Sequence, residues 1–579
     1  MRSRFRIILI KPSHYDDDGY VIQWWRSNIP SNSLASVYAL FAECAENKVL
    51  GPETDIQIEA YDETNVVIDV KRMVRQIREA GAGFVGFVGV QSNQFPRAMD
   101  LARQFRAADI AVVIGGFHVS GCLSMLEEMQ PDLQEALDLG ITLFAGEAEE
   151  RAAALLHDIE ARRTKPIYNY LDDLPNLANA TWPLLPRTIV TRIFGQYTSF
   201  DAGRGCPFQC SFCTIINVQG RKSRRRTPDD IEAIVRANAK QGIKRFFVTD
   251  DNFARNRDWE PILDRLIKLR EEGLKIRLIL QVDTLCHKIP GFIEKAARAG
   301  CNNVFIGLEN INPESLSGAK KKQNRIWEYR EMLQAWKRAK VMTWAGYILG
   351  FPADTPESIR RDIEIIQREL PIDLVEFQML TPLPGSEDHK KLYRQQVPMD
   401  PDMNVYDLEH AATAHARMSG DEWMRAYHDA WRDYYSDAHV ETVLRRAVAM
   451  GLNAKKTALM LTLFSGSVQI ENMHPLQFGF IRRKVRLQRR PTMPVENAFL
   501  FYPKRAFEMV SGLIAWGAII WRYQRILKRV LADPNGRAYV DEALRVGASE
   551  DEAMPDFVRD FADQLSPAQR ASVRSLAAE

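Results

Sequence analysis

The sequence predicts an α/β chain in three parts: an N-terminal doubly wound parallel sheet, a partial (β/α)6 barrel and a mostly α-helical C-terminal region. Three observations support this. Apolar, β-branched runs alternate with helical stretches up to about residue 115, the alternation resumes at residue 197, and the β pattern stops after about residue 390. Such alternation is typical of parallel strands whose connecting helices cover the sheet.

Length and composition narrow the class of protein. A chain of 579 residues with 46% hydrophobic and 26% charged residues has room for about three or four domains and should bury substantial cores. A formal net charge of +2 gives no whole-chain argument for nucleic acid. Of seven cysteines three are clustered, and no apolar h-region of a signal peptide follows Met1 to Arg4, so we expect neither secretion nor disulfides, but a reducing cytoplasm.

The first part should contain a βαβ series. We expect strands at 5–10, 56–61, 84–90 and 110–115, and helices near 33–45, 68–80 and 95–107. In a doubly wound sheet the ligand lies beyond the carboxyl ends of the strands, where glycine lets the backbone approach a large flat ligand. Five residues at these ends are candidate ligand contacts: Ser92, Asn93, Gly115, Gly116 and His118.

A linker should separate the first part from the second. Residues 172–187 contain three prolines and no periodic pattern. We therefore expect domains at 1–165, 196–390 and 391–579, with a linker at 166–195.

The second part repeats a strand, a polar turn and a helix six times. The expected strands are 197–200, 245–248, 277–280, 303–306, 344–349 and 374–380. In such a barrel the active site lies at the carboxyl ends of the strands. Polar or glycine residues recur there, namely Thr249, Asp250, Asp251, Gln281, Glu309 and Gly350. Any one of them could simply cap a helix or form a turn, but their recurrence favours a site.

Cys206, Cys210 and Cys213 form a C-x3-C-x2-C pattern in the loop after the first barrel strand. Three thiolates on one loop can hold three irons of a cubane cluster and leave the fourth iron open for chemistry. A zinc site would need a fourth ligand that no nearby His or Cys supplies. The spacing therefore predicts a [4Fe-4S] cluster.

With Phe212 before the last cysteine, this loop resembles the radical S-adenosylmethionine (radical SAM) family. The resemblance implies that the open iron binds S-adenosylmethionine, which is cleaved to a deoxyadenosyl radical with an electron from a donor such as flavodoxin or ferredoxin. It also implies that 249–251 meets the methionine amino group, that Glu309 lies on the adenosine side, and that the turn at 346–352, with Gly350, packs near adenine. The family's G-G-E after the second strand is absent.

The turns at 115–118 and 146–149 resemble the cobalamin-binding domain that precedes many radical SAM methyltransferases and cyclases. The D-x-H-x-x-G sequence of some cobalamin proteins is absent, although His14 lies in about the corresponding turn. The resemblance therefore implies a Rossmann-like domain that binds cobalamin without a histidine on cobalt. A lone histidine such as His118 is more often a hydrogen-bonded structural residue.

Two further patterns have structural interpretations. The basic run 221–226 should bind nearby carboxylates or the anionic cluster, since neither the overall charge nor interleaved aromatics favour nucleic acid. Five aromatic residues at near-helical spacing should form core: Trp423, Tyr427, Trp431, Tyr434 and Tyr435.

The C-terminal region combines the basic run 482–490 with the apolar run 509–521. That apolar run is shorter than the about 20 residues that cross a bilayer. It is either a buried core helix or a helix lying at an anionic membrane surface, where it would allow peripheral membrane contact or admit a lipid-like substrate.

Together, these resemblances imply a cobalamin-dependent radical SAM C-methyltransferase that acts on an unactivated carbon of a small-molecule or lipid-like substrate. Two alternatives stay open: a cobalamin-linked cyclase or rearrangement enzyme similar to the anaerobic porphyrin ring cyclase, and a cluster-based redox-sensing binding protein. A methylthiotransferase is disfavoured, because Cys44 and Cys122 are too few to bind a second cluster.

Overall fold

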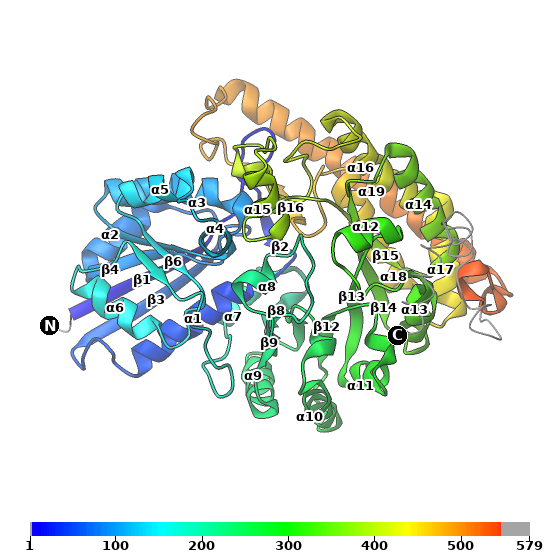
Figure 1. The fold of residues 1–579 in the computed structure, drawn as a ribbon, viewed down its shortest axis with the longest axis horizontal. Helices are drawn as coiled ribbons and strands as arrows, with labels where there is room; N and C mark the ends of the chain where they lie inside the picture. The colour runs from blue at the N-terminus through cyan, green and yellow to red at the C-terminus, as the bar shows by residue number, and fades with distance from the viewer. Residues whose placement is uncertain (1–2, 546–579) are drawn as a thin grey trace.

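The N-terminal part of the computed structural model, which describes residues 3–545, is a six-stranded parallel sheet. Its strand order is β3-β1-β4-β5-β6-β7, drawn in blue to cyan on the left of Figure 1. The strands are β1 (Ser3–Lys11), β3 (Thr54–Asp62), β4 (Gly81–Phe87), β5 (Ala111–Gly115), β6 (Thr142–Ala145) and β7 (Ile167–Asn169). All five pairings are parallel, as the βαβ pattern predicts.

Helices cover both faces of this sheet. Ile7 and Leu9 of β1 pack in the core that α1 (Asn32–Glu46) and α6 (Ala152–Glu160) close, whereas Ile8 and Ile10 pack in the opposite core. The opposite core is closed by α2 (Val70–Ala80), α3 (Phe95–Ala107), α4 (Phe117–Met125) and α5 (Pro131–Asp138). Successive strand residues point to opposite faces, so an almost wholly apolar strand indicates a sheet buried on both sides. The predicted doubly wound fold is confirmed.

The second part is a six-stranded parallel sheet with the order β15-β14-β13-β12-β11-β8. Its strands are β8 (Tyr197–Phe200), β11 (Arg245–Val248), β12 (Arg277–Val282), β13 (Cys301–Glu309), β14 (Met342–Leu349) and β15 (Leu374–Met379). Helices α9 (Pro228–Lys240), α10 (Trp259–Glu271), α11 (Phe292–Ala299), α13 (Tyr329–Arg338) and α14 (Pro356–Glu369) connect them. Figure 1 shows this sheet in green beside the first sheet. The predicted six βα units are confirmed.

The C-terminal region is mostly helical, with α16 (Gly420–Tyr434), α17 (Asp437–Ala449), α18 (Ala454–Gln469) and α19 (Ala498–Ala532). The five aromatic residues predicted to be core, at positions 423, 427, 431, 434 and 435, are all buried. One pairing was not predicted: β2 (Gln23–Ser27) and β16 (Gly479–Arg483) form an antiparallel ribbon. The predicted C-terminal region extends to residue 579, and its last residues, 546–579, lie outside the described part.

The linker prediction differs from the structure at its start. β7 belongs to the first sheet and ends at Asn169, four residues beyond the predicted boundary at 165. Within the predicted linker, α7 (Arg187–Val190) also forms, and its Val190 is buried in the core of the first sheet. Proline-rich sequence here marks extended chain that packs against a domain, which composition alone does not reveal. The division into domains stays our proposal.

The two sheets meet at the turn after β15. Gly121 of α4 lies so close to this turn that an added Cβ would be 2.3 Å from the Pro384 carbonyl oxygen. On the other side, the Thr214 hydroxyl donates to the same oxygen at 3.2 Å, and the Asn217 amide donates to the Gly385 carbonyl at 2.9 Å. Thr214 directly follows the cysteine loop, so this loop is fixed between the two sheets. No helix in the described part of the chain is long and apolar enough to cross a membrane.

Candidate active site

The cysteine loop leaves the carboxyl end of β8 and is framed by the short ladder of β9 (Gly203–Arg204) and β10 (Arg224–Arg225). Gly205 begins the loop with φ of +90°, and an added Cβ would meet the Lys222 carbonyl oxygen at 2.6 Å. Only glycine fits such a position without strain. All seven cysteines are free, and the four outside the loop are buried. The sequence therefore sets a tight turn that presents three free thiols at the carboxyl edge of the barrel.

The thiols lie beside polar side chains from the segment after β13. The Gln323 amide donates to the Cys210 sulfur at 3.4 Å. Lys321 pairs with Glu309, and its ammonium lies 5.6 Å from the Phe212 ring centroid. Burial lowers the pKa of Lys321, but Glu309 and the neighbouring Cys210 outweigh burial, so the pKa lies above its ordinary value. Lys321 therefore carries a positive charge next to the thiols.

The environment of the thiols suits metal binding. Burial raises the pKa of the Cys206 thiol to about 11 and that of Cys213 to about 12. Such thiols do not ionise at neutral pH unless a bound cation replaces the proton. Among the residues that the structure describes, no three His, Cys, Asp or Glu side chains converge on a single-ion site. A cubane cluster binds each thiolate at a different iron and so does not require the three thiols to converge on one point.

A second cation lies near the loop, on the η3 turn (Phe253–Arg255). Arg255 donates twice to the Asp283 carboxylate, at 2.6 and 2.8 Å, and its guanidinium lies 5.5 Å from the Phe208 ring centroid. Asn252 also donates to Asp283 at 2.8 Å. The sequence analysis missed Arg255, Lys321 and Gln323, because nothing in their local sequence links them to the cysteines.

The structure brings Asp250 and Asp251 to the cysteine loop as acceptors of backbone hydrogen bonds. Asp250 accepts from the Ala202 amide at 2.6 Å, and Asp251 accepts from the Gly205 amide at 2.9 Å. Burial raises the pKa of both carboxyl groups to about 7, although these backbone donors lower it. One oxygen of each residue therefore holds the loop in place.

The other predicted barrel residues lie at the same edge with different surroundings. The Gln281 amide donates to the Asp250 carbonyl at 3.3 Å, and the Thr249 hydroxyl donates to the Phe200 carbonyl at 3.3 Å. Gly350 has φ of +98° and lies directly against the Trp423 ring, at 2.1 Å from an added Cβ. Close packing against Trp423 is therefore sufficient to explain why residue 350 is a glycine, and this glycine does not by itself indicate a bound ligand.

Two polar side chains inside the barrel were not predicted. Glu376 and Gln378 alternate with core residues Val375 and Phe377 on β15, so they point to the opposite side, into the barrel. Glu376 accepts from the Trp344 indole at 3.1 Å and from Gln378 at 2.8 Å. Burial raises the pKa of Glu376 to about 8 despite these donors, so it holds a proton at neutral pH. Polar residues at every second position of an otherwise apolar strand could have predicted from the sequence that these side chains point into the barrel.

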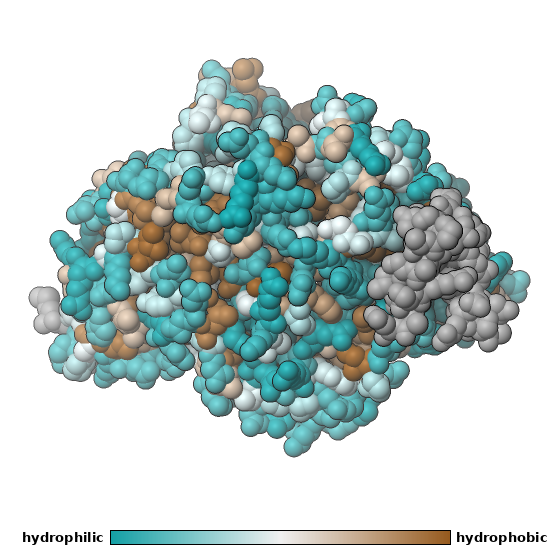
Figure 2. Space-filling model, viewed as in Figure 1, coloured by the Kyte–Doolittle hydropathy of each residue, from teal (hydrophilic) through white to brown (hydrophobic). Residues whose placement is uncertain are grey.

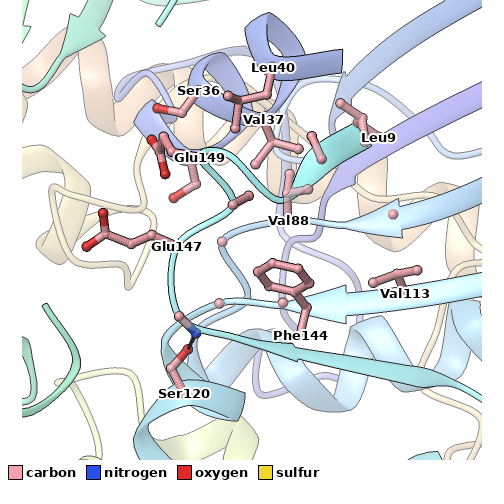
Figure 3. A pocket seen from close by; sticks show the side chains of 18 of the residues that line it. Leu9, Ser36, Val37, Leu40, Val88, Val113, Ser120, Phe144, Glu147 and Glu149 are labelled. Atoms are coloured by element: carbon pink, nitrogen blue, oxygen red, sulfur yellow. Dashed lines mark hydrogen bonds between the residues drawn. The ribbon is translucent and has the colours of Figure 1, made fainter. Parts of the chain in front are cut away.

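A mainly apolar cavity of about 180 Å³ lies at the carboxyl edge of the first sheet, between strand ends and α1. Figure 3 shows Val88, Val113 and Phe144 on the strand side, with Ser36, Val37 and Leu40 on the helix opposite. Of the five residues predicted to contact a ligand here, Gly115 and Gly116 line the cavity, whereas Ser92, Asn93 and His118 do not.

His118 is a buried residue with both ring nitrogens occupied. Nδ1 lies 3.1 Å from the Ser92 hydroxyl, Nε2 lies 2.8 Å from an Asp132 carboxylate oxygen, and the ring packs on Phe95. The histidine of the first turn, His14, bonds Gln477 at 2.9 Å, and burial lowers its pKa to about 4. Neither histidine lines the apolar cavity.

Two polar atoms at the apolar cavity have no partner among the described residues. The Ser36 hydroxyl and the Asn32 amide oxygen are buried and make no hydrogen bond, and both residues line the cavity. A buried polar group without a partner costs about 1–3 kcal/mol. This arrangement fits a ligand that is largely apolar but brings polar atoms to that side.

Arg204 connects this cavity with the cysteine loop. Its guanidinium donates to Glu147 at 2.7 Å, to Glu149 at 2.6 Å and to Asp201 at 3.1 Å. Both glutamates line the cavity, and Figure 3 shows them on the turn after β6. Burial would raise the pKa of Glu149, but Arg204 outweighs burial and holds the pKa below its ordinary value. Arg204 stands two residues before Cys206, so charged contacts join the two sites.

The basic run 221–226 binds carboxylates, as predicted. Arg224 pairs with Glu147, Arg225 pairs with Asp258 at 2.6 Å, and the buried Arg226 lies 3.3 Å from Asp201. These three arginines therefore stabilise the loop region, whereas Arg221 and Lys222 of the run are exposed.

A second cavity, of about 610 Å³, is lined by the turn after β1, by residues 407–410 and by the inner side of α19. The Met379 amide at the end of β15 donates to the Leu408 carbonyl at 2.8 Å, so this cavity lies at the carboxyl ends of strands from both sheets. His410 lies between Asp17 and Asp407, with nitrogen-to-oxygen distances of 3.2 and 2.9 Å. Polar side chains dominate its wall.

Comparison with known proteins identifies the class. Residues 201–366 match the family model described as the radical SAM superfamily. This range contains the cysteine loop and most of the barrel, so this part of the chain is similar to the radical SAM superfamily, and the chain is an enzyme.

Three curated relatives are methyltransferases or methylases. The chain is 27% identical to bacteriochlorophyllide d C-8(2)-methyltransferase of Chlorobaculum tepidum over 333 residues, which cover 54% of this chain and 69% of the relative. It is 26% identical to bacteriochlorophyllide d C-12(1)-methyltransferase of the same organism over 372 residues, covering 62% and 76%. Hopanoid C-2 methylase of Rhodopseudomonas palustris is 26% identical over 322 residues, covering 55% and 58%.

A solved structure shares the fold. A radical S-adenosylmethionine methyltransferase from Kitasatospora setae, determined with cobalamin and a [4Fe-4S] cluster bound, superposes with a TM-score of 0.52 at 16% identity. The match covers 68% of this chain and 78% of that chain. The order of a doubly wound sheet followed by a radical SAM barrel is therefore that of a known enzyme architecture.

Proposed function

We propose that this radical SAM enzyme is a cobalamin-dependent C-methyltransferase that acts on an unactivated carbon. The observation that carries the proposal is the connection between two sites: Arg204, two residues before Cys206, binds Glu147 and Glu149, which line the apolar cavity of the first sheet. Three of the relatives, two methyltransferases and a methylase, support the reaction type.

Cys206, Cys210 and Cys213 are the proposed ligands of a [4Fe-4S] cluster. When bound, the cluster supplies the electron that cleaves S-adenosylmethionine and yields the radical that removes hydrogen from the substrate. Lys321 and Arg255 would offset the negative charge of the thiolates, and Gln323 would donate a hydrogen bond to the Cys210 sulfur. Asp250 and Asp251 would keep the loop in place through their backbone contacts.

For S-adenosylmethionine, we propose contacts at the carboxyl edge of the barrel from Thr249, Asp251, Gln281 and Glu309, with the turn at Gly350 close by. Among the described residues, Asp251 and Glu309 each have a second carboxylate oxygen that makes no hydrogen bond. Asp250 has both oxygens engaged, by Ala202 and Asn256, so its role is to position the loop.

For cobalamin, we propose the apolar cavity of the first sheet. When bound, cobalamin supplies methyl transfer chemistry. A cavity of about 180 Å³ is smaller than typical ligand pockets of about 300–1,000 Å³, so it would receive one part of the cofactor, such as its flat benzimidazole base. Gly115 and Gly116 would allow close approach, and Ser36 and Asn32 would gain partners. No histidine on cobalt is expected, because both ring nitrogens of His118 are engaged, by Ser92 and Asp132, and Nε2 of His14 bonds Gln477.

The substrate is proposed to be a small or lipid-like molecule in the second cavity, at the carboxyl ends of β1 and β15. Its polar walls would hold the polar groups of such a molecule, with the charged His410 among them. The proposal includes an electron donor such as flavodoxin or ferredoxin, but no nucleic acid.

Product analysis tests the function. Anaerobically reconstituted enzyme would be incubated with S-adenosylmethionine, a reductant, cobalamin and candidate substrates, and the nucleoside products would be separated. Methyl transfer predicts S-adenosylhomocysteine and deoxyadenosine in equal amounts. Deoxyadenosine without S-adenosylhomocysteine would instead indicate a cyclisation or rearrangement, and the absence of both with all candidates would point to a redox sensor.

A further inference from the structure

Helix α19 has an outer side that is more apolar than its inner side. Six large apolar residues lie on the outer side and are exposed, with exposed fractions from 57% upward; we name them the outer stripe. They are Phe499, Phe507, Val510, Leu513, Ile514 and Trp521. Their spacing of three, four, seven and eight residues places them on one side of an α-helix. At about 1.5 Å per residue, the stripe runs about 33 Å along the axis.

The inner side of the same helix contains polar residues and the packing residues. Arg505 and Glu508 line the second cavity, and Arg505 donates to the Arg482 carbonyl at 2.5 Å. Farther along, Ile519 and Tyr523 are buried against α17 and α18, and the Tyr523 hydroxyl donates to the Tyr435 carbonyl at 2.8 Å. The sequence analysis gave a buried core helix as one interpretation of residues 509–521, and this interpretation applies only to the inner side of α19.

The outer stripe is also prominent in the whole molecule. Figure 1 draws the first half of α19 in light orange along the upper edge, and Figure 2 shows brown residues at the top of the molecule there. Scattered exposed apolar residues are normal, but a contiguous exposed apolar stripe marks an interaction surface.

Charge indicates what covers the stripe. Helix α19 contains six Lys or Arg residues and one acid, Glu508, which faces inward and bonds Arg505 at 3.1 Å. Arg525 and Lys528 continue the outer stripe at helical spacing beyond Trp521, and the Arg525 guanidinium lies 5.5 Å from the Trp521 ring centroid. Apolar and aromatic residues followed by cations, without exposed acids, are typical of a helix lying in the headgroup region of an anionic bilayer.

We propose that α19 docks this enzyme on the surface of an anionic phospholipid membrane, with the outer stripe in the acyl boundary and Arg525 and Lys528 at the phosphates. A second copy of the chain is the competing occupant. A dimer formed through the outer stripes would bring the cations of two α19 helices together, and the outer side of α19 has no acidic residue to pair with them. Charge repulsion therefore disfavours the dimer.

Vesicle co-sedimentation tests the docking. Full-length enzyme would be mixed with vesicles of phosphatidylcholine, or of phosphatidylcholine with phosphatidylglycerol, at low and high salt. We expect binding to the anionic vesicles that weakens at high salt. Replacing Phe507→Glu and Leu513→Glu together should reduce this binding at least about tenfold, because two charges would enter the acyl boundary.

Leu459→Glu is the matched control, since Leu459 is an apolar residue on α18 that is 50% exposed, and this variant should bind as the wild type does. No sedimentation with anionic vesicles at low salt would overturn the proposal. Equal, salt-independent binding to both kinds of vesicle would overturn the choice of an anionic surface. A dimer in sedimentation velocity that the double variant abolishes, without vesicle binding, would assign the stripe to a second copy. None of these measurements depends on methyl transfer, so the docking and the proposed function can fail separately.

Discussion

Arg204 is the residue in which the two sites of the molecule meet. Three of its guanidinium nitrogens bind three carboxylates, two from the first sheet and one from the turn after β8, and its side chain is only 10% exposed. A buried charge of this kind is stable only while it is paired. The geometry therefore makes Arg204 both a structural support of the cysteine loop and a contact to the apolar cavity.

Replacing Arg204→Met should lower the free energy of unfolding by about 3–5 kcal/mol, since it leaves Glu149 buried without a cationic partner, whereas Glu147 keeps its pairing with Arg224. Urea unfolding followed by circular dichroism measures this change. Arg225→Met is the matched control: its partner Asp258 is partly exposed, and the loss should be about 0–1 kcal/mol. Adding Glu147→Gln and Glu149→Gln to Arg204→Met should restore part of the stability. Equal losses in the Arg204 and Arg225 variants would contradict the assignment.

His410 should stay charged well above neutral pH. Burial lowers its pKa, but the hydrogen bonds to Asp17 and Asp407 outweigh burial and raise the pKa to about 11. Because this pKa is higher than that of an unfolded histidine, about 6.5, the contribution of His410 to stability is fully present below pH 6.5. It is lost progressively between pH 6.5 and about 11.

The difference in thermal midpoint between wild type and His410→Gln should therefore be larger at pH 6 than at pH 9. Replacing the exposed His157 of α6 by Gln serves as the control and should produce no such trend. A difference that grows as the pH rises would show that burial, not pairing, dominates at His410.

Whether a candidate residue could be predicted depends on how far apart in the sequence its interaction partners lie. The cysteines could be predicted because three ligands lie within eight residues and their spacing is itself the signal. Arg204 and Glu149 are 55 residues apart in the sequence. Lys321 lies near Cys210 but belongs to the loop of another strand. No local sequence pattern therefore predicts either interaction. Whether a predicted strand-end residue is free or engaged, as with Asp250 and His118, also depends on neighbours that sequence spacing does not reveal.

At the scale of elements, the strands and helices were predicted from the periodicity of apolar residues and from the residue types at the turns. Buried parallel strands are nearly continuous apolar runs, and the residues that end them are glycines and small polar residues; β11 and α3 were predicted with the bounds that the structure has. The ribbon of β2 and β16 could not be predicted, because its strands are separated by most of the chain and pair in only a few residues. β7, with three residues, is too short to show a period.

The cysteine loop acts as one element, and substitutions within it should have a common effect. Cys206→Ala, Cys210→Ala and Cys213→Ala should each abolish the brown absorbance and reduce iron well below the about four atoms per chain of a cubane cluster. Cleavage of S-adenosylmethionine should disappear in parallel. Cys44→Ala and Cys301→Ala, at buried positions outside the loop, should keep iron and absorbance. Full iron content in any loop variant would contradict the ligand assignment.

At the scale of the whole molecule, two α/β units present their carboxyl edges to each other. The turn at Pro384 and Gly385 touches α4 of the first sheet and the residues just after the cysteine loop. Ligands of parallel sheets lie beyond these edges. In the proposed function each sheet binds its own cofactor, and the facing carboxyl edges would bring both cofactors to one substrate.

This division predicts that the two cofactors can be removed separately. Ser36→Trp should fill the apolar cavity, because Ser36 projects into it from α1 (Figure 3) and an indole would occupy much of its about 180 Å³. The variant should lose cobalamin after reconstitution and keep the iron cluster, since the cysteine loop is untouched. With substrate it should form deoxyadenosine but little S-adenosylhomocysteine. Ser36→Ala, which removes the unpartnered hydroxyl without filling the space, should retain cobalamin. Cobalamin bound at wild-type level by Ser36→Trp would place the cofactor elsewhere, and loss of iron together with cobalamin would mean that the two sites fold as one unit.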